Sequence, residues 1–189
     1  MKNKFKNLGF LFVFTTLFIV LTSSCSKKDD TSTEISDDNF YQQTGAAIVS
    51  CYVNIFNEVL DNVPVGTQDT TVNLFGGTIV ITGSDGYDTI NHVTTTDLLF
   101  TMTGIKYSYT NTNSDKPWIT EVTLTGATTY SGSFSSSFKD VNHHSDNLKI
   151  KGSVTYDDAV RNIDDAGVVD IVRKTATTTV TIFGHTVAW

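Results

Sequence analysis

The chain has 189 residues, with 13 Lys and Arg against 20 Asp and Glu, a net charge of −7. The first 24 residues hold three lysines and no acidic residue, so the remainder carries 10 basic and 20 acidic residues, a net of −10. An acidic body without a Lys/Arg cluster cannot neutralise phosphates, which argues against nucleic-acid binding. Hydrophobic residues make up 39% of the chain, which excludes a disordered polypeptide and a bundle of membrane helices.

The N-terminal segment has the three parts of an export signal. Three lysines (Lys2, Lys4 and Lys6) form a positive region, an apolar run follows over residues 8–21, and small residues end it. The apolar run has 14 residues, whereas a transmembrane helix needs about 20. This length favours a signal peptide over residues 1–24, and an uncleaved N-terminal anchor is the alternative.

Cys25 directly follows the small residues. The run 21–25, Leu-Thr-Ser-Ser-Cys, resembles the lipobox of bacterial lipoproteins, with Thr22 where that family usually has a large aliphatic residue. The resemblance implies that Cys25 receives a diacylglycerol thioether and begins the mature chain, which carries two or three acyl chains. One acyl chain binds a membrane only marginally, whereas two or three anchor a protein stably. We therefore expect lipidation at Cys25 and a membrane-bound protein of the cell envelope.

Residues 26–30, Ser-Lys-Lys-Asp-Asp, resemble the export tag of surface-exposed lipoproteins in some Gram-negative bacteria. This implies an outer-membrane lipoprotein displayed at the cell surface. A periplasm-facing lipoprotein and a plain solvated linker are the alternatives, since charged runs are commonly solvated. Residues 25–36 contain no aromatic residue, so we expect the lipidated cysteine and a flexible tether here, followed by a single domain over 37–189.

The domain is expected to begin with an amphipathic helix over about residues 38–61, which Ser36 or Asp37 can cap and Pro64 ends. Apolar side chains recur every four residues in two adjacent rows: Ala47, Cys51, Ile55 and Val59, and Ile48, Tyr52, Phe56 and Leu60. The polar side lacks the Lys and Arg of helices that lie on membranes, so we expect the apolar stripe to pack against protein.

From Val65 onward the apolar period changes to two, which is typical of strands with one wet face. The predicted fold class is α+β: the helix packed on a curved antiparallel sheet of about 7–8 strands, as a half-barrel or open sandwich. The predicted details are a hairpin turn at Gly76–Gly77, a bulge at Gly104, a turn over 111–117, a loop with a helical turn over 156–167, and two strands within 168–189.

Three segments share the spacing apolar-x-Gly-x-x-x-Tyr, and their glycines are Gly83, Gly126 and Gly152. Each glycine lies on the apolar side of its expected strand, where a missing side chain permits a strand bend or a close approach of the helix. Coincidence among strands rich in Gly, Thr and Tyr is the alternative.

No arrangement of residues predicts a catalytic site. Cys51 has apolar neighbours, which favours a buried structural thiol over a nucleophile. His143, His144 and Asp146 are weak metal-site candidates in a polar stretch between strands, where we expect a hydrated loop. Adjacent residues of an extended chain point in opposite directions, so the two histidines cannot chelate one ion together.

The carboxylate pairs Asp157–Asp158 and Asp164–Asp165, and the segment 84–88, are expected to serve as turn residues before any calcium or acid–base role. Several aromatic residues are candidates for stacking on sugars, with the protein core as their expected place: Tyr107, Tyr109, Trp118, Tyr130, Tyr156 and Trp189. No cofactor is expected.

The sequence thus favours a lipid-anchored cell-envelope protein that acts as a non-catalytic binding or accessory module. Its ligand is an apolar molecule, such as an acyl chain, held between the helix and a curled sheet. The alternatives are an interaction subunit of a surface protein complex, which docks an envelope protein through the Thr-rich face or an edge strand, and an envelope hydrolase.

Overall fold

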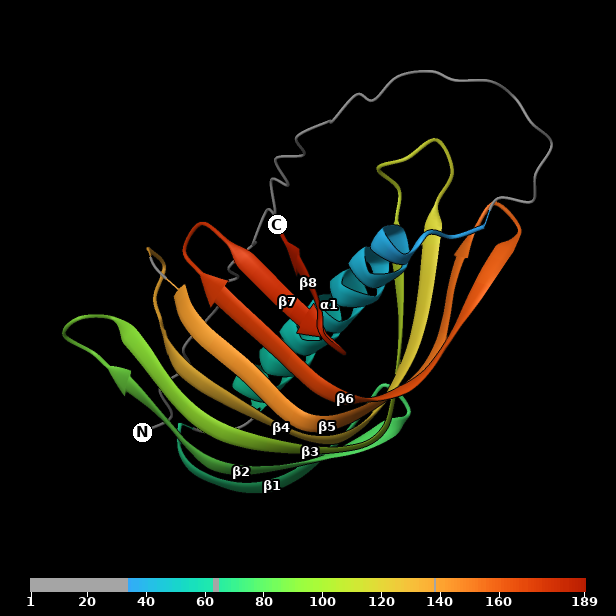
Figure 1. Cartoon of the computed structure of the whole chain (residues 1–189). Helices are drawn as coiled ribbons and strands as arrows, with labels where there is room; N and C mark the ends of the chain where they lie inside the picture. The colour runs from blue at the N-terminus through green and yellow to red at the C-terminus, as the bar shows by residue number, and fades with distance from the viewer. Residues whose placement is uncertain (1–33, 63–64, 138) are drawn as a thin grey trace. The chain divides into compact units, whose positions relative to one another are not determined.

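The computed structural model describes residues 34–62, 65–137 and 139–189 (Figure 1). The predicted signal peptide, Cys25 and all but the last residues of the predicted tether lie outside the described residues. Within the described part, one helix is followed by eight strands.

Helix α1 extends over Asp37–Asn62, close to the predicted bounds. Of the two predicted capping residues, Ser36 takes the role. Its carbonyl oxygen accepts a hydrogen bond from the backbone N of Phe40 at 2.9 Å, and its Oγ lies 3.4 Å from the backbone N of Asn39. Asp37 and Asp38 occupy the first turn, where carboxylates interact favourably with the helix dipole.

The eight strands form one antiparallel sheet in sequence order, so that each strand pairs with the next. They are β1 (Gly66–Leu74), β2 (Gly77–Asp88), β3 (Val93–Asn111), β4 (Trp118–Phe134), β5 (Lys139–Tyr156), β6 (Ala159–Lys174), β7 (Thr178–Ile182) and β8 (His185–Ala188). The first and last strands do not pair with each other, so the sheet is open. The prediction of one helix with an antiparallel sheet of about 7–8 strands is confirmed.

Three irregularities in strand pairing line up across the middle of the sheet. They lie between Met102 and Ile105, between Thr125 and Thr129, and between Ser145 and Leu148. Because β-bulges bend strands and increase their twist, a row of them concentrates curvature along one line. Figure 1 shows β3 to β6 bending strongly, with α1 on their concave side. The first irregularity contains Gly104, at a φ of 65°, which confirms the bulge predicted there.

A second source of curvature is a set of strand glycines with positive φ: Gly83, Gly126, Gly132 and Gly152. Gly152 is the clearest case, at a φ of 153°. A Cβ atom there would lie 1.8 Å from the backbone oxygen of Glu121 on β4, so only glycine fits. At all three predicted glycines φ is positive and an added Cβ would meet the backbone of a neighbouring strand, so the close approach is made by a strand and not by the helix. Their tyrosines differ in environment, since Tyr87 is exposed and Tyr130 is buried.

The core contains inward-facing side chains of the sheet together with one side of α1. The hydroxyl oxygens of Tyr52 on α1 and Thr128 on β4 are 2.9 Å apart, within the buried interior. One turn later, the ring of Phe56 lies 4.5 Å from that of Tyr130. These contacts lie on the apolar rows that the sequence predicts for the helix.

Two turns differ from their predictions because residues other than glycine adopt the left-handed backbone conformation in them. The β1–β2 turn is Phe75–Gly76, with φ of 50° and 72°, so Gly77 already lies in a strand. The predicted loop with a helical turn over 156–167 is wrong: Asp157–Asp158 form a two-residue turn, with φ of 46° and 68°, and β6 begins at Ala159. Aspartate tolerates this conformation well.

The two strands predicted within 168–189 are present as β7 and β8. The end of β6 precedes them, because β6 continues through Gly167, which pairs with Leu148. One further prediction is wrong. The segment 84–88, expected to be turn-forming, lies inside β2. The turn follows it, where Asp88 Oδ1 accepts hydrogen bonds from the backbone N of Ile90 at 2.8 Å and of Asn91 at 3.1 Å.

Candidate functional site

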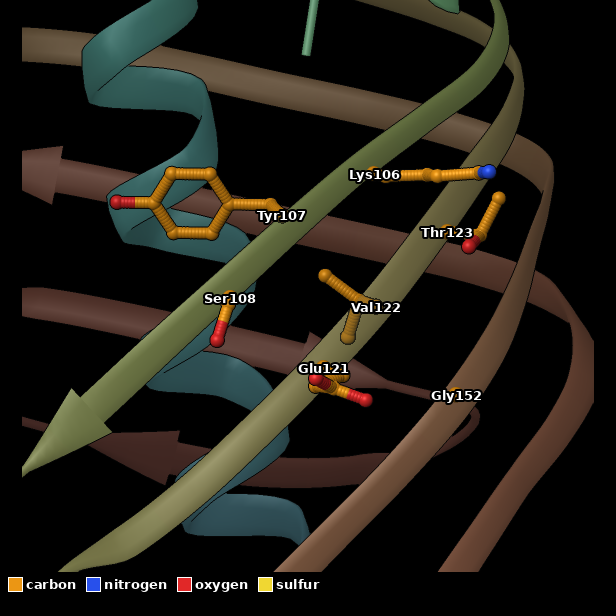
Figure 2. A pocket seen from close by; sticks show the side chains of 7 residues that line it. All are labelled: Lys106, Tyr107, Ser108, Glu121, Val122, Thr123 and Gly152. Atoms are coloured by element: carbon orange, nitrogen blue, oxygen red, sulfur yellow. The ribbon is translucent and has the colours of Figure 1, made fainter. Parts of the chain in front are cut away.

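An open groove of about 330 Å³ crosses β3, β4 and β5 beyond the row of bulges (Figure 2). Its lining residues are Lys106, Tyr107, Ser108, Glu121, Val122, Thr123 and Gly152. Its volume is at the lower end of the range for small-molecule sites, about 300–1,000 Å³.

The bulge at Gly104 decides which side chains of β3 line the groove. Before the bulge the odd-numbered residues Thr101 and Thr103 are exposed, and after it the even-numbered residues Lys106 and Ser108 are. Lys106 is paired with Thr123 across the strands, and Ser108 is paired with Glu121. One amine, one carboxylate and two hydroxyls thus meet on the face turned away from the core.

One lining residue of the groove, Tyr107, contacts helix α1. Figure 2 shows the Tyr107 ring pointing toward α1, and its hydroxyl oxygen lies 2.8 Å from Ser50 Oγ and 2.9 Å from Asn54 Nδ2. These two contacts hold the Tyr107 hydroxyl at the helix. The groove suits weak hydrogen bonding to a polar molecule. Ser108 lies opposite Glu121, but among the described residues no hydrogen bond joins the two side chains.

His143 lies inside the protein, on β5. Its ring stacks on Tyr52 at 4.9 Å and meets Tyr130 edge-on at 4.4 Å. Burial lowers the pKa of His143 to about 3, and the positive charge of Arg173 adds to this effect. Its Nδ1 atom has no hydrogen-bond partner among the described residues. His143 is thus a neutral core residue.

His144 lies on the opposite face of β5. Its Nδ1 is 2.5 Å from Asp170 Oδ1, and its Nε2 is 3.1 Å from Asp146 Oδ1. These hydrogen bonds, first that to Asp170, raise the pKa of His144. Both ring nitrogens of His144 therefore face carboxylate oxygens, and among the described residues no group of three His, Cys, Asp or Glu side chains is arranged to hold a metal ion.

The two histidines therefore point in opposite directions, as predicted, but the predicted hydrated loop is wrong because both lie in β5. Val141, His143 and Ser145 are buried and alternate with exposed residues. This alternation is the signal of a strand, and the polarity of the histidines and serine concealed it.

Cys51 is a buried thiol on α1, as predicted, and burial raises its pKa to about 12. The thiol therefore stays protonated at neutral pH and cannot act as a nucleophile, since the thiolate is the reactive form.

The paired carboxylates take separate roles. Asp157 forms an ion pair with Lys116, and Asp164 Oδ1 lies 3.1 Å from Lys151 Nζ. Asp165 accepts a hydrogen bond from the backbone N of Ala166 at 2.8 Å. Asp157 and Asp164 lie seven residues apart, one in a turn and one within β6, so they do not form one acid–base site.

Most candidate sugar-stacking residues have structural contacts. Tyr130 is buried, and Trp118 stacks on Tyr156 with ring centres 4.2 Å apart. Trp189 is 41% exposed, and its ring would lie 3.0 Å from a Cβ placed on Gly45 of α1. Core packing, which the sequence favoured, thus accounts for several of these aromatic side chains.

Among the described residues, no helix is both long enough and apolar enough to cross a membrane. No protein-family model matches the chain, and no curated protein or solved structure is significantly similar to it.

Proposed function

We propose that this protein is an outer-membrane lipoprotein, anchored through a lipidated Cys25 and exposed at the cell surface, whose folded part is a non-catalytic binding or accessory module. The support for the anchor is the leader sequence, with its basic start, short apolar run and lipobox-like end at Cys25. Cys51 is buried and protonated, so it does not compete with Cys25 for modification.

The finer fold belongs to the same proposal: a half-barrel in which α1 packs permanently on the concave face. The contacts of Tyr52 with Thr128 and of Phe56 with Tyr130 support this arrangement. Two contacts of Arg161 on β6 with the start of the helix also support it. Arg161 Nη1 lies 2.7 Å from Asp37 Oδ1, and the Arg161 guanidinium lies 4.1 Å from the centre of the Phe40 ring.

The choice of a surface-binding module is supported by the contacts that side chains of α1 make with the inner face of the sheet. Where a ligand-binding half-barrel would hold an acyl chain, side chains of α1 already contact those of the sheet. An apolar ligand would have to displace them. The outer face instead offers exposed side chains for a protein partner, so the role of an interaction subunit is favoured over that of an acyl carrier.

Metabolic labelling tests the anchor. A full chain expressed in a Gram-negative host should incorporate radiolabelled palmitate, the Cys25→Ala variant should not, and the matched Cys51→Ala variant should. Protease treatment of intact cells should remove the protein if it is surface-exposed. A secreted, unlabelled wild-type protein would refute the proposal.

Native mass spectrometry of the purified full chain tests the apolar-ligand alternative. A mass that exceeds the chain with its anchor by one further lipid would favour an acyl-binding role. A mass equal to the anchored chain alone agrees with a module that binds through its outer surface.

A further inference from the structure

Charge is strongly segregated along the sheet. Residues 65–105 contain four aspartates, Asp69, Asp85, Asp88 and Asp97, and no Lys or Arg, whereas eight of the basic residues lie from Lys106 to Lys174. The first two strands and the first half of β3 therefore carry aspartates and no Lys or Arg.

Two of these aspartates flank aliphatic side chains on the outer face. Asp69 on β1 is paired with Thr82 on β2, which is paired with Leu99 on β3. Asp97 lies two residues from Leu99 on the same face of β3, and Val80 lies two residues from Thr82 on β2. These five residues form a continuous surface, which we call the acidic–apolar patch.

The patch faces solvent. Val80 is 39% exposed and Leu99 is 38% exposed, while their strand neighbours Ile79, Ile81 and Leu98 are buried on the opposite face. The carboxylates of Asp69 and Asp97 form no ion pair or hydrogen bond with the described residues. The partly exposed side chains of Val80 and Leu99 thus offer a small apolar area bordered by two carboxylates that have no partner among the described residues.

The geometry selects the kind of partner. Two strand spacings and a two-residue offset separate Asp69 from Asp97 by about 12 Å, too far for both to ligate one metal ion. An anionic lipid surface or a nucleic acid would be repelled. A polypeptide that presents Lys or Arg beside aliphatic side chains satisfies both the charge and the apolar area.

We propose that the acidic–apolar patch is the docking site for a basic segment of a partner protein, in which Lys or Arg side chains flank an aliphatic side chain on one face. The proposal rests on the binding-module part of the proposed function and names the chemistry of the partner. It does not depend on lipidation, since the patch lies wholly within the described domain.

The probe is a fluorescent peptide of nine residues. Its odd-numbered positions alternate between Lys and Leu, and its even-numbered positions are Thr. In an extended chain, Lys and Leu therefore lie on the same face. Its binding to the full chain, purified in mild detergent, is followed by fluorescence anisotropy. We expect saturable binding, at least tenfold weaker binding when Glu replaces Lys, and a similar loss when Thr replaces Leu.

Matched variants locate the binding. Asp97→Asn with Leu99→Thr should weaken binding at least tenfold, whereas Asp158→Asn with Val160→Thr should change it less than twofold. Val160 is 61% exposed on β6, and Asp158 is exposed in the turn before it. All four positions are at the surface, and circular dichroism confirms that each variant is folded.

Three results would overturn the proposal: absence of binding to the wild-type chain, equal weakening by both double variants, or a self-association abolished by Leu99→Thr, which would make a second copy the occupant. Palmitate labelling is independent of all three. Loss of the docking site and failure of the anchor are therefore distinguishable.

Discussion

At the scale of single residues, His143 and His144 show how one peptide bond can separate opposite electrostatic environments. His143 points into the core between two tyrosine rings, where its charged form is disfavoured. His144 points to solvent between two carboxylates, which favour its charged form. The alternation of a strand creates this difference, because successive side chains lie on opposite faces of the sheet.

His143 predicts a loss of stability in acid. Its pKa is about 3 in the folded protein and about 6.5 in an unfolded chain, so the unfolded state binds the proton better. The contribution of His143 is therefore complete above pH 6.5 and decreases as the pH falls toward 3. In urea unfolding of the full chain at pH 7 and pH 4.5, His143→Phe should reduce the difference in unfolding free energy between the two pH values.

His144→Asn is the control of opposite sign. The raised pKa of His144 gives stability that is fully present below its unfolded value of about 6.5 and is lost as the pH rises. Its removal should therefore increase the destabilisation in acid. If both variants changed the pH dependence in the same direction, the assignment of His143 as a buried neutral residue would be wrong.

At the scale of elements, curvature comes from bulges and glycines on neighbouring strands. The bulges align across β3 to β6, and the glycines with positive φ allow neighbouring backbones to approach where a side chain would collide. The bend places the ends of long strands around α1 (Figure 1).

Gly152→Ala tests this account. The added Cβ would lie 1.8 Å from the backbone oxygen of Glu121, so β4 and β5 would have to separate locally. We expect a loss of at least about 2 kcal/mol of unfolding free energy, measured by urea denaturation. Gly184→Ala is the matched control, because Gly184 also has a positive φ, of 87°, but no atom lies within 4 Å of its added Cβ. It should cost only about 1 kcal/mol.

At the scale of the whole molecule, an open sheet has a graded stability. Strands β3, β4 and β5 have hydrogen-bonded neighbours on both sides, whereas β1 and β8 are edges and β8 has only four residues. Local opening is easiest where few contacts must break. The centre of the sheet and the helix packed on it should therefore form the most stable unit.

Hydrogen exchange of the full chain measures this gradient. The slowest amides should lie in β3 to β5 and in α1 near Tyr52, and the fastest strand amides should lie in β8. Exchange in α1 as fast as in β8 would mean that the helix leaves the sheet readily, which would revive the concave face as a ligand site.

Local patterns in the sequence determined the types of the elements. The four-residue apolar period placed α1 within a residue of its ends, the period of two predicted an antiparallel sheet, and the change of parity at Gly104 located a bulge. The same patterns misassigned His143 and the segment 156–167, because polar residues on the inner face and aspartates in a tight turn resemble loop residues.

The sequence by itself determined the helix, most of the strands and the absence of basic side chains from residues 65–105, because these properties depend on neighbours along the chain. Only the tertiary structure decided that Asp69 and Asp97 lie on the same face of the sheet as Val80 and Leu99, and that His143 is buried and neutral. These facts depend on strand register and sheet curvature, which bring together residues far apart in the chain.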